Sequence, residues 1–229
     1  MLKFRFLTYT NFGLMEKWYE EMAREGWQIE KIPFPFVHKF KKAEPAEIKY
    51  QFTIAPNETW HVKFSKEELA DYDQMADDYG WHLVDRTFNM NLYEIDEEGA
   101  DSLYDDYSYE IEILNKSIKG EIISLSLTTL FFTFLAFSNI ARLGSSEIYN
   151  YNFPIFLSPA ISLFIIFSII SLGDYIGFKR RNKGVLDIND LKFTRLGIGK
   201  LMAILEMVSI IFVILSWVTG IFSLIGNSY

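Results

Sequence analysis

The chain has 229 residues; half of them are hydrophobic and none is cysteine. The absence of cysteine excludes disulfides, thiol nucleophiles and thiolate-bound metal or iron–sulfur sites. Residues 1–115 carry 12 basic and 24 acidic side chains, a net charge of −12, whereas residues 116–229 carry 10 and 6, a net charge of +4. This asymmetry predicts two physically different halves.

Alternating and helical spacings of apolar residues predict a small α+β domain over residues 1–95. Alternation predicts extended segments at Phe4 and Phe6, along residues 34–40, and most clearly along residues 48–54. Two helices are expected between these segments, the second beginning with a capping box at Ser65–Glu68. Their apolar faces are Met15, Trp18, Tyr19 and Met22 in the first helix, and Leu69, Tyr72, Ala76 and Tyr79 in the second.

Each predicted helix ends at a glycine, Gly26 or Gly80, where a left-handed residue closes the last turn. Each glycine is followed by a tryptophan and an extended segment. The order helix, Gly-Trp, strand, turn, strand therefore occurs twice, about 54 residues apart. We predict a duplicated α-β-β unit with an antiparallel sheet and two helices on one face of it.

Short motifs spread over residues 2–115 follow a recognisable order. They are Lys17-Trp18, Met22-Ala23, Gly26-Trp27, Phe40 with Glu44-Pro45 and Tyr50, Gly80-Trp81, and the acidic Leu103-Tyr104-Asp105-Asp106. In this order the chain resembles the domain of unknown function 2812 family, and it departs from it at Asn91-Leu92-Tyr93, where relatives usually have a Trp-x-Phe-like strand. The resemblance implies a bacterial membrane-anchored protein, often found beside PadR-like transcription regulators. It implies no established activity and no catalytic residue.

Residues 96–119 are predicted to connect the domain to the second half of the chain. The stretch 94–112 holds nine carboxylates and no basic residue, and its apolar residues fall at helical spacing. We therefore expect an acidic juxtamembrane connector that forms an amphipathic helix.

Three apolar runs dominate the second half: 122–141, 153–173 and 207–225, with 20, 21 and 19 residues and no charge. Each run, as a helix, is ~30 Å long, which is the thickness of the hydrocarbon core of a bilayer. Core helices of a soluble bundle would show a polar face, and residues 130–135 show none. We predict an all-α, three-helix transmembrane domain over 120–226, with spans at about 120–141, 153–174 and 202–225.

Basic residues in the connections predict the orientation of these spans. Lys116 and Lys119 precede the first span, the first connection holds one basic residue, the loop 177–200 holds seven, and the tail holds none. The positive-inside rule then gives a cytoplasmic N-terminus and an external C-terminus in the inner (cytoplasmic) membrane. Lys3 and Arg5 interrupt the apolar start of the chain, so no cleavable signal peptide is expected.

Two sets of charged residues are candidate sites. Glu121, Asp174 and Glu206 stand at the predicted cytoplasmic ends of the three spans, either as a shared cation or proton site or as interfacial carboxylates paired with nearby basic residues. The basic loop 177–200 is expected to contact anionic lipid. Its candidate contacts are Lys179, Arg180, Arg181 and Lys183, with Leu186, Ile188, Leu191, Phe193 and Leu196 laid on the membrane. An alternative is that the acidic connector docks on this loop.

No pattern in the sequence predicts a catalytic residue, a metal site or a cofactor. His38, His61 and His82 have no metal-ligand spacing, and Gly197-Ile198-Gly199-Lys200 lacks the spacing of a phosphate loop. Nucleic-acid binding is disfavoured because the cytoplasmic domain is acidic and repels phosphate.

The leading interpretation is a non-enzymatic multi-pass membrane protein whose cytoplasmic domain senses or tethers a protein partner, in a PadR-regulated stress or envelope response. The alternative is a small transport, efflux or immunity component. Because three spans enclose no conventional pathway, that alternative requires a homo-oligomer. It predicts that changes at Glu206 or Asp174 abolish activity while the soluble domain is dispensable.

Overall fold

A computed structural model describes residues 1–54, 66–87, 90–95, 107–143, 153–185 and 190–194, and nine residues between 201 and 215. The described elements are β1 (Leu2–Phe4), α1 (Phe12–Arg24), β2 (Trp27–Phe34), β3 (Val37–Lys42), β4 (Lys49–Ile54), α2 (Lys66–Asp78), β5 (His82–Thr87), β6 (Met90–Ile95), α3 (Tyr107–Leu143) and α4 (Phe153–Arg181). They form two compact units: Met1–Gly120 with Gly177–Lys200, and Glu121–Ile176 with Leu201–Tyr229.

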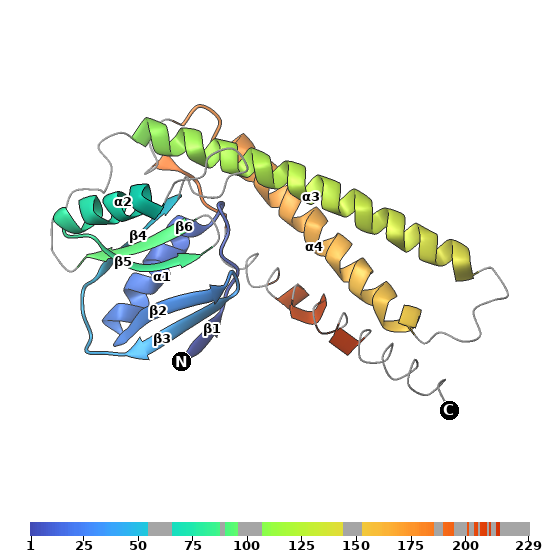
Figure 1. Cartoon of the computed structure of the whole chain (residues 1–229), viewed down its shortest axis with the longest axis horizontal. Coiled ribbons are helices and arrows are strands. Elements are labelled where there is room, and N and C mark those ends of the chain that lie inside the picture. Colours follow the sequence, from blue (N-terminus) through green and yellow to red (C-terminus); the bar gives the residue numbers. More distant parts are fainter. Residues whose placement is uncertain are drawn as a thin grey trace. The chain divides into compact units, whose positions relative to one another are not determined.

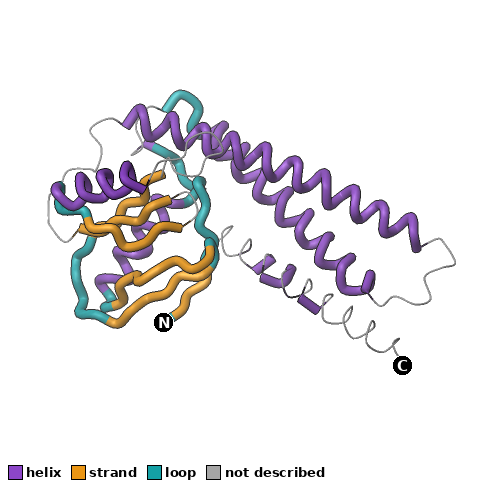
Figure 2. Tube along the Cα trace, viewed as in Figure 1, coloured by secondary structure: helices purple, strands orange, loops and turns teal. Residues whose placement is uncertain are grey.

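The first unit contains two three-stranded sheets with equivalent connections (Figures 1 and 2). Sheet A has the order β1-β3-β2 and sheet B has the order β4-β6-β5, and every pairing is antiparallel. In each sheet the first strand precedes the helix in the chain, and the last strand lies in the middle of the sheet. The order seen in each half is thus strand, helix, strand, strand. The antiparallel α+β character of the domain agrees with the sequence-based expectation.

The two sheets meet at strands β2 and β5, where side chains bridge the edges. The backbone N–H of Ile32 donates to Oδ2 of Asp85 at 2.5 Å, and the Thr87 hydroxyl donates to the Ile32 carbonyl at 3.1 Å. Both backbone groups of one edge residue are therefore satisfied by side chains of the other sheet.

Removing the Asp85 carboxylate is expected to weaken the contact between the sheets. Asp85→Ala leaves the Ile32 N–H without its acceptor, which costs about 1–3 kcal/mol of unfolding free energy. Denaturant unfolding of the full chain in mild detergent, followed by tryptophan fluorescence, measures the loss. The control is Asp71→Ala, an exposed position on α2, for which a change within about 0.5 kcal/mol is expected. Equal unfolding free energies for the two variants would contradict the bridge.

A buried aromatic core surrounds Tyr19 of α1. Its ring lies 5.8 Å from Tyr50 and 6.0 Å from Phe52 in sheet B, and 6.1 Å from Phe40 in sheet A. Helix α1 therefore packs on both sheets. All four residues predicted for its apolar face are buried, as expected.

Helix α2 packs on the opposite face of sheet B. Tyr93 and Ile95 form a buried cluster with Ala76 and Trp81, whereas Phe52 faces α1. Because Phe52 is paired with Leu92, and side chains alternate along a strand, Tyr93 points away from α1. The prediction that both helices cover one face is wrong. Periodicity shows which face of a helix is apolar, but it does not show which side of a sheet that face covers.

Both predicted helix-ending glycines have the expected conformation. Gly26 and Gly80 each have a φ of 81°, and each amide donates to a carbonyl three residues back. A side chain at either position would be strained. The capping box at Ser65 lies outside the described residues.

Two local expectations in this domain need correction. Residues 34–40 are not one strand, because β2 and β3 form a hairpin that turns at Pro35 and Phe36; proline has no N–H to donate to a sheet. Tyr79 follows the end of α2 and is 67% exposed rather than part of its apolar face. Residues 91–93 differ from the family pattern in sequence and still lie in a strand, at the centre of β6.

Helix α3 joins the predicted connector to the first apolar run without a break at residue 119. Ile111, Leu114 and Ile118 are buried at helical spacing, and the residues from 121 onward belong to the second unit. In that unit the Phe132 ring of α3 lies 4.5 Å from the Phe164 ring of α4. Among the described residues, one segment is long and apolar enough to cross a membrane, Ile161–Arg181 of α4. The third predicted span lies mostly outside the described residues.

Candidate functional site at the start of helix α1

The turn after α4 is fixed by Asn182. Its Oδ1 accepts from the Lys192 backbone N–H at 2.8 Å, and its Nδ2 donates to the Phe178 carbonyl at 3.1 Å. Gly184 in this turn has a φ of 81°, in the left-handed region that favours glycine. This turn directs residues 190–194 back toward the α+β domain within the first compact unit.

Residues 190–194 dock on the start of α1, and we call this contact the junction. The Thr194 backbone N–H donates to the Thr10 carbonyl at 2.8 Å. The Phe193 ring meets the Phe12 ring edge-on at a centroid distance of 4.9 Å. A Cβ placed at Gly13 would overlap the Phe193 ring. Glycine is therefore needed at this position because the Phe193 ring occupies the space of a Cβ, and not because of an unusual backbone conformation.

The receiving surface is a buried polar turn at residues 8–11. Asn11 Oδ1 accepts from the Thr8 N–H at 2.9 Å, Asn11 Nδ2 donates to the Phe6 carbonyl at 2.7 Å, and the hydroxyls of Thr8 and Thr10 lie 2.9 Å apart. Thr8, Thr10 and Asn11 are at most 4% exposed. Because these polar groups bond one another, the turn holds its shape and presents the Thr10 carbonyl to Thr194.

A second buried network lies beside α1. The Nε2–H of His38 donates to the Arg5 carbonyl at 2.8 Å, which leaves Nδ1 to accept from the Tyr19 hydroxyl, also at 2.8 Å. Burial lowers the pKa of His38 to about 4 and raises that of Tyr19 above its ordinary value. Both side chains are therefore neutral at pH 7. The Arg5 guanidinium lies 4.0 Å from the centre of the Trp18 ring, a cation–π contact.

The basic residues predicted to contact lipid occupy the last turn of α4 and the turn after it. Lys179, Arg180, Arg181 and Lys183 are all exposed. Three of them lie where the helix dipole favours positive charge. Arg181 also donates from Nη2 to the Thr194 hydroxyl at 2.8 Å, which ties this basic turn to the junction.

The three predicted carboxylates are only partly described. Glu121 on α3 and Asp174 on α4 are half-buried, and both belong to the second unit. Glu206 lies outside the described residues. Among the described residues, no three His, Asp or Glu side chains are placed to share a metal ion.

The sequence-based interpretation missed the junction. The sequence analysis places Leu191 and Phe193 on the membrane surface, whereas Leu191 is buried and Phe193 packs against Phe12 and Gly13. The described part of the loop docks on α1, and residues 96–106 of the acidic connector lie outside the described residues. Two features of the sequence could have indicated the junction: an aromatic residue in a basic loop, and a glycine at the second position of a helix. Neither is specific, because Phe193 and Gly13 are 180 residues apart in the chain.

The fold and the junction define a class of protein: a small antiparallel α+β domain joined to long apolar helices. A family model described as "Protein of unknown function (DUF2812)" matches residues 11–126, slightly more than half of the chain. The chain belongs to this family. The match begins at the junction and extends into α3. Comparison with curated proteins found no match, and comparison with solved structures found none either.

Proposed function

We propose that this protein is a non-enzymatic, three-span protein of the inner membrane, whose cytoplasmic α+β domain binds a protein partner and transmits that event to helix α4. The observation that carries the proposal is the junction. The segment that follows α4 is folded into the same compact unit as the domain. A partner that alters the start of α1 therefore acts on the end of an apolar helix.

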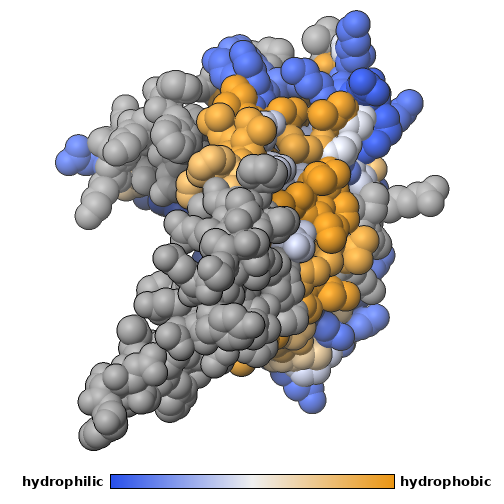
Figure 3. Space-filling view, turned by 90° about the vertical axis from the view of Figure 1, so that its right-hand side faces the viewer, coloured by the Kyte–Doolittle hydropathy of each residue, from blue (hydrophilic) through white to orange (hydrophobic). Residues whose placement is uncertain are grey.

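Exposed apolar side chains support the membrane location. On α3, Leu127, Leu130 and Phe134 are more than 60% exposed, and on α4 Ile169 is 58% exposed. Figure 3 shows apolar side chains gathered over one face of the molecule. Water makes such a surface costly, whereas the hydrocarbon of a bilayer covers it without cost.

Hydroxyl groups along α3 also suit a bilayer. Ser126, Thr128, Thr129 and Thr133 each donate to the carbonyl four residues earlier, at 2.6–2.7 Å. Thr128 and Thr133 do so at exposed positions. A hydroxyl that faces lipid has no water to bond, so bonding within the helix satisfies it.

Equivalent strand order supports a further proposal, that the domain arose by duplication of one β-α-β-β unit. Each half has its helix end at a glycine with a φ of 81°, followed by a tryptophan. The unit includes the strand before each helix, which the sequence-based unit omitted.

Thiol labelling in intact cells tests the proposed orientation. The chain has no cysteine, so Asp190→Cys introduces a single thiol at an exposed position after α4. A maleimide that does not cross membranes is expected to label Asp190→Cys in inverted vesicles and not in intact cells. Ser228→Cys is expected to show the opposite pattern. Labelling of position 190 from outside would overturn the proposed topology.

A further inference from the structure

In the described part of the chain, the outer face of sheet A, the face turned away from α1, carries exposed apolar side chains. His38 and Phe40 point toward Trp18 of α1, so their strand neighbours point outward. The register then places Leu2, Phe4 and Phe34 on the same outer face. These side chains are 54%, 49% and 57% exposed. Phe34 is further stacked on Phe36, with ring centres 5.8 Å apart.

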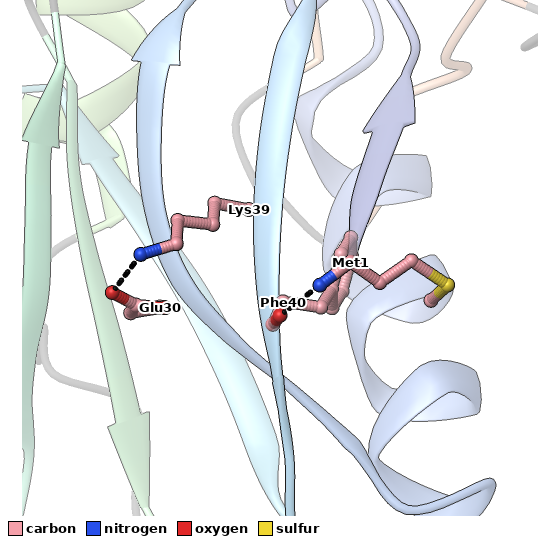
Figure 4. A network of polar contacts seen from close by, with 4 residues as sticks. All are labelled: Met1, Glu30, Lys39 and Phe40. Carbon is pink, nitrogen blue, oxygen red and sulfur yellow. Dashed lines mark hydrogen bonds and ion pairs between the residues drawn. The ribbon is translucent and has the colours of Figure 1, made fainter.

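The same face is basic. Lys39 and Lys41 alternate outward on β3, and Lys31 lies opposite Lys39 on β2. Among the described residues, Lys39 pairs with Glu30, whose Oε1 accepts from Lys39 Nζ at 2.6 Å (Figure 4). The Met1 nitrogen donates to the Phe40 carbonyl at 2.7 Å and holds β1 beside β3. Lys31 and Lys41, which are not part of the Glu30–Lys39 pair, are exposed on the same face.

This local charge contrasts with the rest of the domain. Residues 1–42 carry eight basic and five acidic side chains, whereas residues 43–115 carry four and 19. The apolar side chains of sheet A are therefore on the one basic part of an otherwise strongly acidic domain. Exposed apolar side chains flanked by lysines fit a surface that is negatively charged outside and apolar beneath, because the lysines meet the charge and the rings enter the apolar layer.

We infer that the outer face of sheet A is a docking surface for anionic lipid headgroups of the membrane that anchors the chain. The inference rests on the proposed function, since the apolar helices keep a bilayer within reach of the domain. Phe4, Phe34 and Leu2 insert at the headgroup boundary, and Lys31 and Lys41 meet lipid phosphates. Anionic lipid thus sets whether the domain lies on the membrane or is free to meet a partner.

Fluorescence quenching in nanodiscs tests the inference with the full chain. Single thiols at Phe34, at Ile169 of α4 and at Tyr79 on the acidic part carry a polarity-sensitive dye. The discs contain brominated phosphatidylcholine, with or without phosphatidylglycerol. At position 34 the ratio of lipid-bound to free domain is expected to rise roughly 25-fold when phosphatidylglycerol is present, because Lys31 and Lys41 each contribute roughly a fivefold increase near an anionic surface. Position 79 is expected to stay unquenched.

Charge reversal separates lipid binding from a general charge effect. Lys31→Glu with Lys41→Glu is expected to abolish quenching at position 34. The matched control, Lys17→Glu with Lys49→Glu, makes the same change of net charge at exposed lysines on α1 and β4 and is expected to retain it.

Each result has a defined meaning. Quenching at position 169 without quenching at 34 would overturn the lipid-docking inference and leave the membrane anchor intact. Absence of quenching at both positions would overturn the membrane anchor and the inference together. Protection of position 34 in detergent, lost on dilution, would show that a second copy of the chain covers this face, and would overturn the inference.

Discussion

Replacing Gly13 with alanine is expected to release residues 190–194 from the start of α1. The new Cβ would overlap the Phe193 ring, so the ring has to leave its place beside Phe12. Overpacking of this kind costs about 1–3 kcal/mol. Hydrogen exchange of the full chain in nanodiscs measures the release, because the Thr194 amide donates to the Thr10 carbonyl only while the segment is docked. Faster exchange at Thr194 is the expected result.

The same substitution is expected to have the opposite effect on stability once the ring is removed. In a Phe193→Ala background, Gly13→Ala no longer meets the ring, and alanine in a helix is more favourable than glycine by up to about 1 kcal/mol. Gly120→Ala on α3 is the matched control, since a Cβ there meets no atom within 4 Å. It is expected to leave exchange at Thr194 unchanged. Unaltered Thr194 exchange in the Gly13→Ala variant would remove the junction as the link between the domain and α4.

Stability of the α+β domain is expected to fall by about 3 kcal/mol as pH decreases from above 6.5 to below 4, through His38 alone. The pKa of His38 is lowered from 6.5 to about 4 in the folded chain. The unfolded chain therefore binds a proton over this range that the folded chain excludes. The stabilisation is complete above the unfolded pKa and is lost as pH falls through the folded pKa. Denaturant unfolding at several pH values measures it.

Two variants isolate the contribution of His38. His38→Gln is expected to lower stability at pH 7, where it loses the imidazole contacts, and to reduce the pH dependence, so that its deficit relative to the unaltered chain shrinks between pH 6.5 and 4. Tyr19→Phe removes the hydroxyl that donates to Nδ1 but keeps the imidazole, so a lower stability with the pH dependence retained is expected. If His38→Gln kept the full pH dependence, other groups, such as carboxylates, would be responsible for it.

Local features of the domain were accessible from the sequence because they depend on a few neighbouring residues. Gly26 and Gly80 end helices in the left-handed conformation that other residues avoid. Met15, Trp18, Tyr19 and Met22 are buried on one face of α1, as their spacing predicts. The motif order that resembles the family also led to a correct family assignment.

Features that depend on distant residues were missed or misassigned. The sequence predicts a membrane contact for Phe193 because its nearest charged neighbours are basic, whereas its neighbour in the structure, Gly13, lies far away in the chain. The position of α2 on the opposite face of sheet B was missed for a related reason. When helices cover both faces of a sheet, a central strand buries the side chains that point to either face. Nothing in the residues of that strand shows which helix lies on which side.

The amino-acid sequence by itself determined the apolar helices, the acidic domain and the residues that begin and end its secondary structure, since backbone preferences and hydrophobicity act over a few residues. Only the tertiary structure decided that sheets A and B meet through Asp85, that His38 is buried against Tyr19, and that the segment after α4 seats its ring beside Gly13. Those contacts join residues far apart in the chain, and they exist only after packing has brought their surfaces together.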